Sequence, residues 1–145
     1  MNKPDPQSLA EACAEALWQA DTASQAHGMK VEKVGPGNCS VSMAITESMC
    51  NGHGTCHGGV IFTLADSAFA FACNSYNQNA VAQHCSVTYI APAMCGDTLT
   101  ANACELSVQG RNGIYDVAIV NQEGIRIAEF RGHSRTIKGT LIPES

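Results

Sequence analysis

The sequence is poor in charged residues, since only 14% of its 145 residues are Asp, Glu, Lys or Arg. A typical globular domain has roughly 25%. With 45% hydrophobic residues, the chain has too few charges to cover a free surface, so we expect part of that surface to be buried in a homo-oligomer. The chain also lacks a basic run and has a formal net charge of -5, which argues against nucleic acid as a partner.

Long apolar runs are absent as well. No segment is apolar over the ~20 residues that a membrane-spanning helix needs, and residues 1–21 contain no apolar signal core. We therefore expect a cytoplasmic protein with no membrane partner, and its length suits a single domain over residues 1–145. Its eight cysteines form no C-x-x-C pair, so we expect reduced thiols, most of them small buried side chains.

Asp66 is the only charged residue between Glu47 and Asp97. It lies in a segment, residues 58–74, that is apolar on nearly all sides of a helix, so we expect this helix to be wrapped by other structure. Burying a lone ionised carboxylate is costly unless it is paired, hydrogen-bonded or protonated. From the residue alone, Asp66 is either a structural carboxylate with hydrogen-bonding partners or a functional base or nucleophile.

Turn residues separate the remaining elements. A short amphipathic helix is expected at residues 6–20, with Ser8 as its N-cap and Glu11 in the capping-box position. Strands are expected at residues 31–34, 39–46, 80–90, 98–109, 114–121 and 126–137. Because the strands cluster rather than alternate with helices, this order favours an α+β fold with an antiparallel sheet.

Gly58 and Gly59 lie at the expected start of the long helix, where the first N–H groups have no intrahelical partner. Without a Cβ, they would let a carbonyl oxygen approach these N–H groups as negative charge develops on it. A plain loop-to-helix junction would explain the same pair. Gly58 and Asp66 are about 12 Å apart along one helix, so both would serve one reacting atom only across a two-fold dimer interface.

The preceding loop carries further polar candidates. Asn51 could orient a water or a carboxylate, or only form an Asn-Gly turn, and His57 could fix the loop, touch a substrate or only pack. Cys50, His53, Cys56 and His57 could ligate zinc, but their spacing matches no usual zinc motif and we expect no metal. A nucleophilic dyad of Cys56 and His57 is less favoured still, because adjacent side chains usually point apart.

The densest cationic patch lies on the last expected strand. Alternation puts Arg131, His133 and Arg135 on one face, to which Arg111 and Lys138 could add. This face could bind phosphate groups, or it could simply be a solvated strand face.

Several motifs together resemble the hotdog-fold acyl-CoA thioesterases, and most of all the phenylacetate-degradation branch. They are N-G-H-x-x-C-H-G-G at 51–59, L-A-D at 64–66, A-F-A-x-A-C-N at 68–74, G-D-T-L-T-A at 96–101 and F-R-G-H-S at 130–134. The resemblance covers about residues 30–140, and its H-G-G-x-x-x-x-L-A-D core is quite specific to these thioesterases.

The resemblance implies a long central helix wrapped by a six-stranded antiparallel sheet, in dimers with active sites at the interface that pair into tetramers. It implies hydrolysis of acyl-CoA thioesters, including ring-hydroxylated phenylacetyl-CoA, with no cofactor apart from the CoA of the substrate. Asp66 would then be the base or nucleophile, and the Gly58 N–H would polarise the thioester carbonyl. His57 and Asn51 would support them.

The resemblance also offers candidates for contact with the substrate. They are Gly59 and Ser67 beside the catalytic groups, Phe62 and Phe69 in the acyl pocket, and Arg131 with Gly132 near the nucleotide end of CoA. Three other hypotheses stay open: a hydratase or dehydratase of the same fold, a non-catalytic acyl-CoA-binding module, and a metal-binding regulator.

Overall fold

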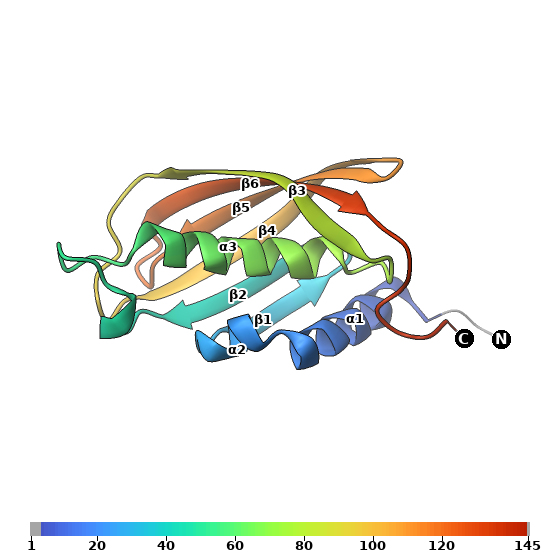
Figure 1. Cartoon of the computed structure of the whole chain (residues 1–145), viewed down its shortest axis with the longest axis horizontal. Helices are drawn as coiled ribbons and strands as arrows, with labels where there is room; N and C mark the ends of the chain where they lie inside the picture. Colours follow the sequence, from blue (N-terminus) through green and yellow to red (C-terminus); the bar gives the residue numbers. More distant parts are fainter. Residues whose placement is uncertain (1–3, 145) are drawn as a thin grey trace.

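The computed structural model describes residues 4–144. Helix α3 (Gly58–Cys73) lies across one face of a curved six-stranded sheet, with helices α1 (Pro6–Ala20) and α2 (Thr22–Ala26) beside it (Figure 1). The strands are β1 (Lys30–Gly35), β2 (Asn38–Ala44), β3 (Ala80–Tyr89), β4 (Thr98–Gln109), β5 (Asn112–Val120) and β6 (Arg126–Thr136). All neighbouring strands pair antiparallel, which confirms the expected α+β class and the hotdog architecture.

Helix α3 packs its apolar face against β2 and β4 in the middle of the sheet. Leu64, Ala65 and Ala68 on this face are completely buried, and the two alanines let the helix approach the sheet closely. Further along, the Phe69 ring packs against Tyr115 and Phe130, with ring centroids 5.6 and 5.9 Å away. The sheet therefore wraps the helix, as its apolar composition predicted.

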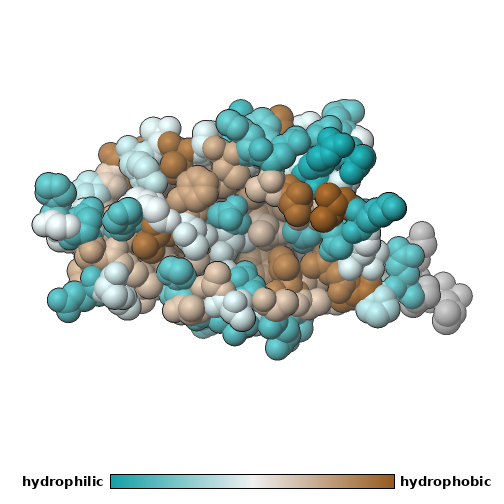
Figure 2. Space-filling view, viewed as in Figure 1, coloured by the Kyte–Doolittle hydropathy of each residue, from teal (hydrophilic) through white to brown (hydrophobic). Residues whose placement is uncertain are grey.

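The strand order β1-β2-β4-β5-β6-β3 leaves β3 at one edge of the sheet. β3 pairs with β6, and within residues 4–144 no strand covers its other side. Val81, Tyr89 and Ile90, on this strand and just after it, are 46%, 49% and 54% exposed. Figure 2 shows other hydrophobic residues reaching the surface among hydrophilic ones. A long edge strand with exposed apolar side chains is a template for pairing with another chain.

The start of α1 differs from the prediction. Asp5, not Ser8, is the N-cap: its side chain accepts a hydrogen bond from the Ser8 N–H at 2.9 Å. The helix begins at Pro6, because proline has no N–H to satisfy and its fixed φ suits the first helical position. Glu11 accepts a hydrogen bond from Gln7 at 3.0 Å instead of closing a capping box, so that prediction was wrong.

Gly132 on β6 is required by close packing. A Cβ built at this position would lie 2.8 Å from three ring carbons of Phe69, which is buried in the core. We expect Gly132→Ala to lower the free energy of unfolding by about 1–3 kcal/mol, because a filled core has no room for an added methyl group. Denaturant unfolding measures this, and Gly52→Ala is the control because nothing lies within 4 Å of its Cβ. Equal midpoints for the two variants would contradict the prediction.

Candidate active site

The loop before α3 is held by one side chain. The Asn51 Oδ1 accepts hydrogen bonds from the His53 N–H at 2.9 Å, the Thr55 N–H at 3.3 Å and the Thr55 hydroxyl at 3.2 Å. The backbone closes the same loop, because Cys50 and Cys56 form an antiparallel bridge. Asn51 therefore builds the loop with its oxygen, which leaves its NH₂ group for any contact outside the loop.

His57 is the N-cap of α3. Its Nδ1 accepts a hydrogen bond from the Gly59 N–H at 3.1 Å, and its backbone carbonyl accepts one from the Val60 N–H at 2.9 Å. When neutral, the ring must therefore carry its proton on Nε2. This assigns His57 the loop-fixing role that the sequence had left open among others.

The N–H groups of the two glycines differ in whether they have a hydrogen-bond partner. The Gly59 N–H is bonded to His57, whereas the Gly58 N–H has no hydrogen-bond acceptor among the described residues. Gly58 is the first residue of the helix, so its N–H lies at the positive end of the helix dipole. Of the two glycines, Gly58 is thus the one that can donate to a developing oxyanion.

Tyr89, at the end of β3, lies directly over Gly58. Its hydroxyl donates to the Gly58 carbonyl oxygen at 2.7 Å, and a Cβ on Gly58 would lie 2.9 Å from the tyrosine Cζ. A cavity of about 370 Å³ opens beside this contact. Its lining residues are Thr55, Cys56, Gly58, Ile61, Tyr89, Ile90, Ala91, Pro92 and Ala93. Sequence reasoning missed Tyr89, because its 31-residue separation from Gly58 leaves no local signal.

Asp66 lies on α3 about two turns beyond Gly58 and does not line this cavity. Its carboxylate is half-buried, and within residues 4–144 no side chain or backbone group hydrogen-bonds it. Burial raises the pKa of the Asp66 carboxyl, and the negative charge of Asp21 raises it further. No hydrogen bond within residues 4–144 ties this carboxylate to the fold, so it is open to solvent or to a ligand.

The family is established by comparison with known proteins. The model of the thioesterase superfamily matches residues 53–128, just over half of the chain and the part that contains Gly58, Asp66 and Tyr89. This chain belongs to the thioesterase superfamily.

Relatives of this thioesterase cover nearly all of its length. It is 44% identical to the acyl-coenzyme A thioesterase PaaI of Escherichia coli K12 over 91% of this chain and 94% of that protein. The solved structure of the E. coli PaaI protein from the phenylacetic acid degradation operon matches with a TM-score of 0.92 and 41% identity, covering 94% of this chain and 99% of that one. A variant of the phenylacetic acid degradation protein PaaI from Thermus thermophilus matches with a TM-score of 0.78 and 35% identity, covering 81% and 100%.

The predicted substrate-contacting residues of the thioesterase fall into two groups. Gly59 is exposed and Phe62 is half-buried, with its ring against Phe130 at a centroid distance of 5.2 Å. Ser67, Phe69 and Gly132 are buried within the protomer, and the Ser67 hydroxyl is already bonded to Ser24 at 2.7 Å. Within one protomer, the first group can reach a ligand and the second cannot. The roles of both groups in binding stay predictions.

The cationic strand of the thioesterase is partly neutralised. Arg131 and Arg135 are exposed and His133 is half-buried, so the predicted alternation holds. Arg131 donates two hydrogen bonds to Asp116, at 2.6 and 2.9 Å, and holds the pKa of that carboxyl below its usual value. Because this fork-to-fork pair occupies the guanidinium, Arg131 is less available for CoA phosphates than its sequence position suggested.

The thiols of the loop are poor candidates for a nucleophile. Cys56 is buried, and burial raises the pKa of its thiol to about 11, with the neighbouring Cys50 adding to the effect. A nucleophilic cysteine needs a lowered pKa, so the structure argues against the Cys56–His57 dyad. Over residues 4–144, no three or more His, Cys, Asp and Glu side chains are arranged to hold a metal ion. No helix in this part of the chain is long and apolar enough to cross a membrane.

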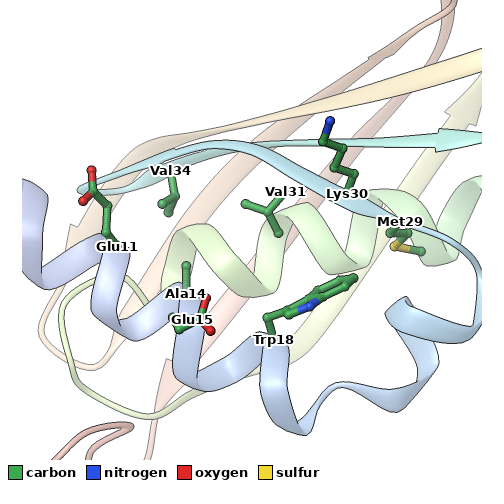
Figure 3. A pocket seen from close by; sticks show the side chains of 8 residues that line it. All are labelled: Glu11, Ala14, Glu15, Trp18, Met29, Lys30, Val31 and Val34. Atoms are coloured by element: carbon green, nitrogen blue, oxygen red, sulfur yellow. The ribbon is translucent and has the colours of Figure 1, made fainter.

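A second cavity of about 380 Å³ lies between α1 and β1, away from α3's first turn (Figure 3). Trp18 and Val31 form its apolar walls, and Glu11, Glu15 and Lys30 surround it. None of the predicted site residues lines it. The cavity beside Gly58, which is lined by the residue with the free N–H, is therefore the candidate active site.

Proposed function

We propose that this thioesterase hydrolyses acyl-CoA thioesters, with arylacetyl-CoA, including ring-hydroxylated phenylacetyl-CoA, as its acyl class. The E. coli and T. thermophilus proteins that it resembles are named for acyl-CoA hydrolysis and for phenylacetic acid degradation. The observation that carries the proposal is the free N–H of Gly58, a residue that lines a cavity at the start of α3. The phenylacetic acid degradation operon that encodes the E. coli protein supports a role in the catabolism of aromatic compounds, and a cytoplasmic location is part of the same proposal.

The chemistry needs a carbonyl-polarising donor and a base. The thioester oxygen would accept a hydrogen bond from the Gly58 N–H, which stabilises the charge that develops on it. Asp66 would take a proton from water as the water attacks the carbonyl carbon. The CoA thiolate then leaves and gains a proton, so thioester and water become free acid and CoA. Direct attack by Asp66, followed by hydrolysis of the resulting anhydride, gives the same products.

Two protomers would build each site. Gly58 and Asp66 lie on one continuous helix, about 12 Å apart along its axis, which is too far for one reacting atom. A two-fold axis beside the free edge of β3 would bring Asp66 of one protomer towards Gly58 of its partner. The exposed apolar side chains around β3 support this edge as the dimer interface. Pairing of dimers into a tetramer is part of the same proposal, and light scattering measures the mass.

Turnover of several thioesters tests the function. The probes are phenylacetyl-CoA, a ring-hydroxylated analogue, acetyl-CoA and an unsaturated acyl-CoA, each separated from free CoA by chromatography. A thiol reagent would be a poor readout, because all eight cysteines are free and Cys95 and Cys104 are exposed. We expect release of CoA, fastest from the arylacetyl substrates. Hydration of the unsaturated substrate with an intact thioester would favour a hydratase, and tight binding without turnover would favour a binding module.

A further inference from the structure

A chain of hydrogen bonds joins α2 to the middle of α3. The Ser24 hydroxyl lies 2.6 Å from the Asp21 Oδ2 and 2.7 Å from the Ser67 hydroxyl. A carboxylate only accepts, so Ser24 donates its single hydroxyl hydrogen to Asp21, and Ser67 must donate to Ser24. Both serines are buried, with 1% and 8% of their surface exposed. The chain thus runs from the neighbour of Asp66 to a second carboxylate.

Asp21 is fixed in place by this arrangement. Besides the Ser24 hydroxyl, its side chain accepts the Ser24 N–H at 2.9 Å as the N-cap of α2. These bonds leave the carboxylate little freedom to turn away from α3. Because the Ser24–Ser67 bond is buried, breaking it would leave a buried hydroxyl without a partner, so the contact between the two helices is specific.

The titratable side chains near Asp66 differ in charge. Burial is the main cause that raises the pKa of Asp66, and the charge of Asp21 is the second. The thiols of Cys73 on α3 and Cys85 on β3 also lie near Asp66, but burial raises the pKa of both, so they are neutral around pH 7. Within residues 4–144, no ion pair or hydrogen bond to Asp66 opposes these effects. Among the described residues, Asp21 is thus the charged side chain that hydrogen bonds through Ser24 and Ser67 connect to the residue next to Asp66, and its charge raises the pKa of Asp66.

We propose that Asp21 is a positioning residue of this thioesterase, fixed by Ser24 and Ser67, which acts on the reaction through the negative charge that it places beside Asp66. This inference rests on the proposed function, in which Asp66 is the base. A general base is most effective when its pKa lies near the working pH, and a carboxylate at its ordinary pKa is a weak base. A second carboxylate that disfavours ionisation makes Asp66 bind a proton more tightly.

The N-cap of α1 offers a matched control. Asp5 accepts the Ser8 N–H at 2.9 Å and the Ser8 hydroxyl at 2.8 Å, which repeats the Asp21–Ser24 geometry at the start of α1. Asp5 does not act on Asp66. Asp21→Asn and Asp5→Asn each remove one charge and keep an oxygen that caps the helix. Asp21→Glu keeps the charge but changes the cap, so the three variants separate charge from capping.

The test is the pH dependence of kcat in the full chain. We expect the acid limb of the profile to move to lower pH in Asp21→Asn, to stay in place in Asp5→Asn, and to return towards wild type in Asp21→Glu. A purely structural role would lower the melting temperature of Asp21→Asn and leave the limb unmoved, which would overturn the proposal. An equal shift in Asp5→Asn would also overturn it. Should Asp21→Asn fail to fold, Asp21→Ser replaces it, since serine also caps without charge.

A direct titration separates this inference from the proposed function. Carbon-13 NMR follows the Asp66 carboxyl, whose resonance is identified by its loss in Asp66→Asn. We expect its midpoint to move to lower pH in Asp21→Asn. If Asp66→Asn abolishes turnover but the titration is the same with and without the Asp21 charge, only the inference on Asp21 fails. If turnover does not depend on Asp66 at all, the assignment of the base fails, and the role of Asp21 in catalysis fails with it.

Discussion

Replacing Asp66 by Asn should lower kcat for thioester hydrolysis by roughly 10²–10⁴-fold, the usual contribution of a positioned base. The amide has nearly the same shape but cannot take a proton at neutral pH. Since the carboxylate makes no hydrogen bond within residues 4–144, the substitution removes no hydrogen bond of this part of the chain. Chromatographic detection of CoA gives kcat, and calorimetry with a non-hydrolysable thioester analogue gives binding. Turnover within threefold of wild type would remove Asp66 from the mechanism.

Asp66→Asn should lower turnover but not the stability of the fold. The pKa of folded Asp66 lies above its ordinary value because the carboxyl is half-buried. Ionisation therefore costs the folded state free energy at neutral pH, and this cost disappears as the pH falls through the raised pKa. We expect Asp66→Asn to melt at the same or a higher temperature than wild type at pH 7. A clear loss of stability would point to a structural carboxylate with a partner in the assembled protein.

Asp97 is the control carboxylate for Asp66, because its pKa is shifted in the opposite direction. Hydrogen bonds from the Met94 N–H at 2.8 Å and from Gln122 at 2.9 Å hold its pKa below the ordinary value. Such a group stabilises the folded state above its unfolded pKa, and this stabilisation is lost as the pH falls through the folded value. Asp97→Asn should thus lose a little stability at pH 7 and keep its turnover, the reverse of Asp66→Asn.

The second large effect is expected at Gly58. Gly58→Val should lower kcat by roughly 10²–10³-fold, the typical cost of losing one oxyanion donor, because the side chain would cover the free N–H. A Cβ alone would lie 2.9 Å from the Tyr89 Cζ, so Gly58→Ala should also displace that ring and give an intermediate loss. Gly52→Ala in the preceding loop is the control, since nothing lies within 4 Å of its Cβ. Equal turnover in Gly58→Val and wild type would contradict the oxyanion assignment.

Mixing the two inactive variants tests whether the site is shared. In a heterodimer of Asp66→Asn and Gly58→Val protomers, one site carries both substitutions and the other carries none. Random mixing of equal amounts should then restore about a quarter of wild-type activity, because half of the dimers are mixed and half of their sites are intact. If each protomer held a complete site, mixing would restore nothing.

Much of the fold followed from local patterns. Helix α3 and the six strands lie within a few residues of their expected ranges, because apolar periodicity and turn residues act over short distances. The error at Ser8 was also local. Asp5 and Pro6 together form a better helix start than Ser8, with Asp5 as the N-cap and Pro6 as the first helical residue. Helix α2 was not expected, as five residues are too few to show a period.

The candidate site also has features that the sequence indicated and features that it did not. The glycine pair and the isolated carboxylate were visible in the sequence, because a rare residue type in an apolar segment stands out. The contact of Tyr89 with Gly58 and the chain from Asp21 to Ser67 were not visible. They join residues on different elements, and only the packing of those elements brings the side chains together.

By itself, the sequence determined an α+β fold with one apolar helix, a glycine pair at the start of that helix, and one carboxylate within it. Its motifs also indicated the thioesterase family. Only the tertiary structure decided that His57 binds the Gly59 N–H and leaves the Gly58 N–H free, and that Ser24 and Ser67 link Asp21 to the residue after Asp66 on α3. Hydrogen-bond partners and electrostatic neighbours depend on distances of a few ångströms between elements, and periodicity along a chain does not encode those distances.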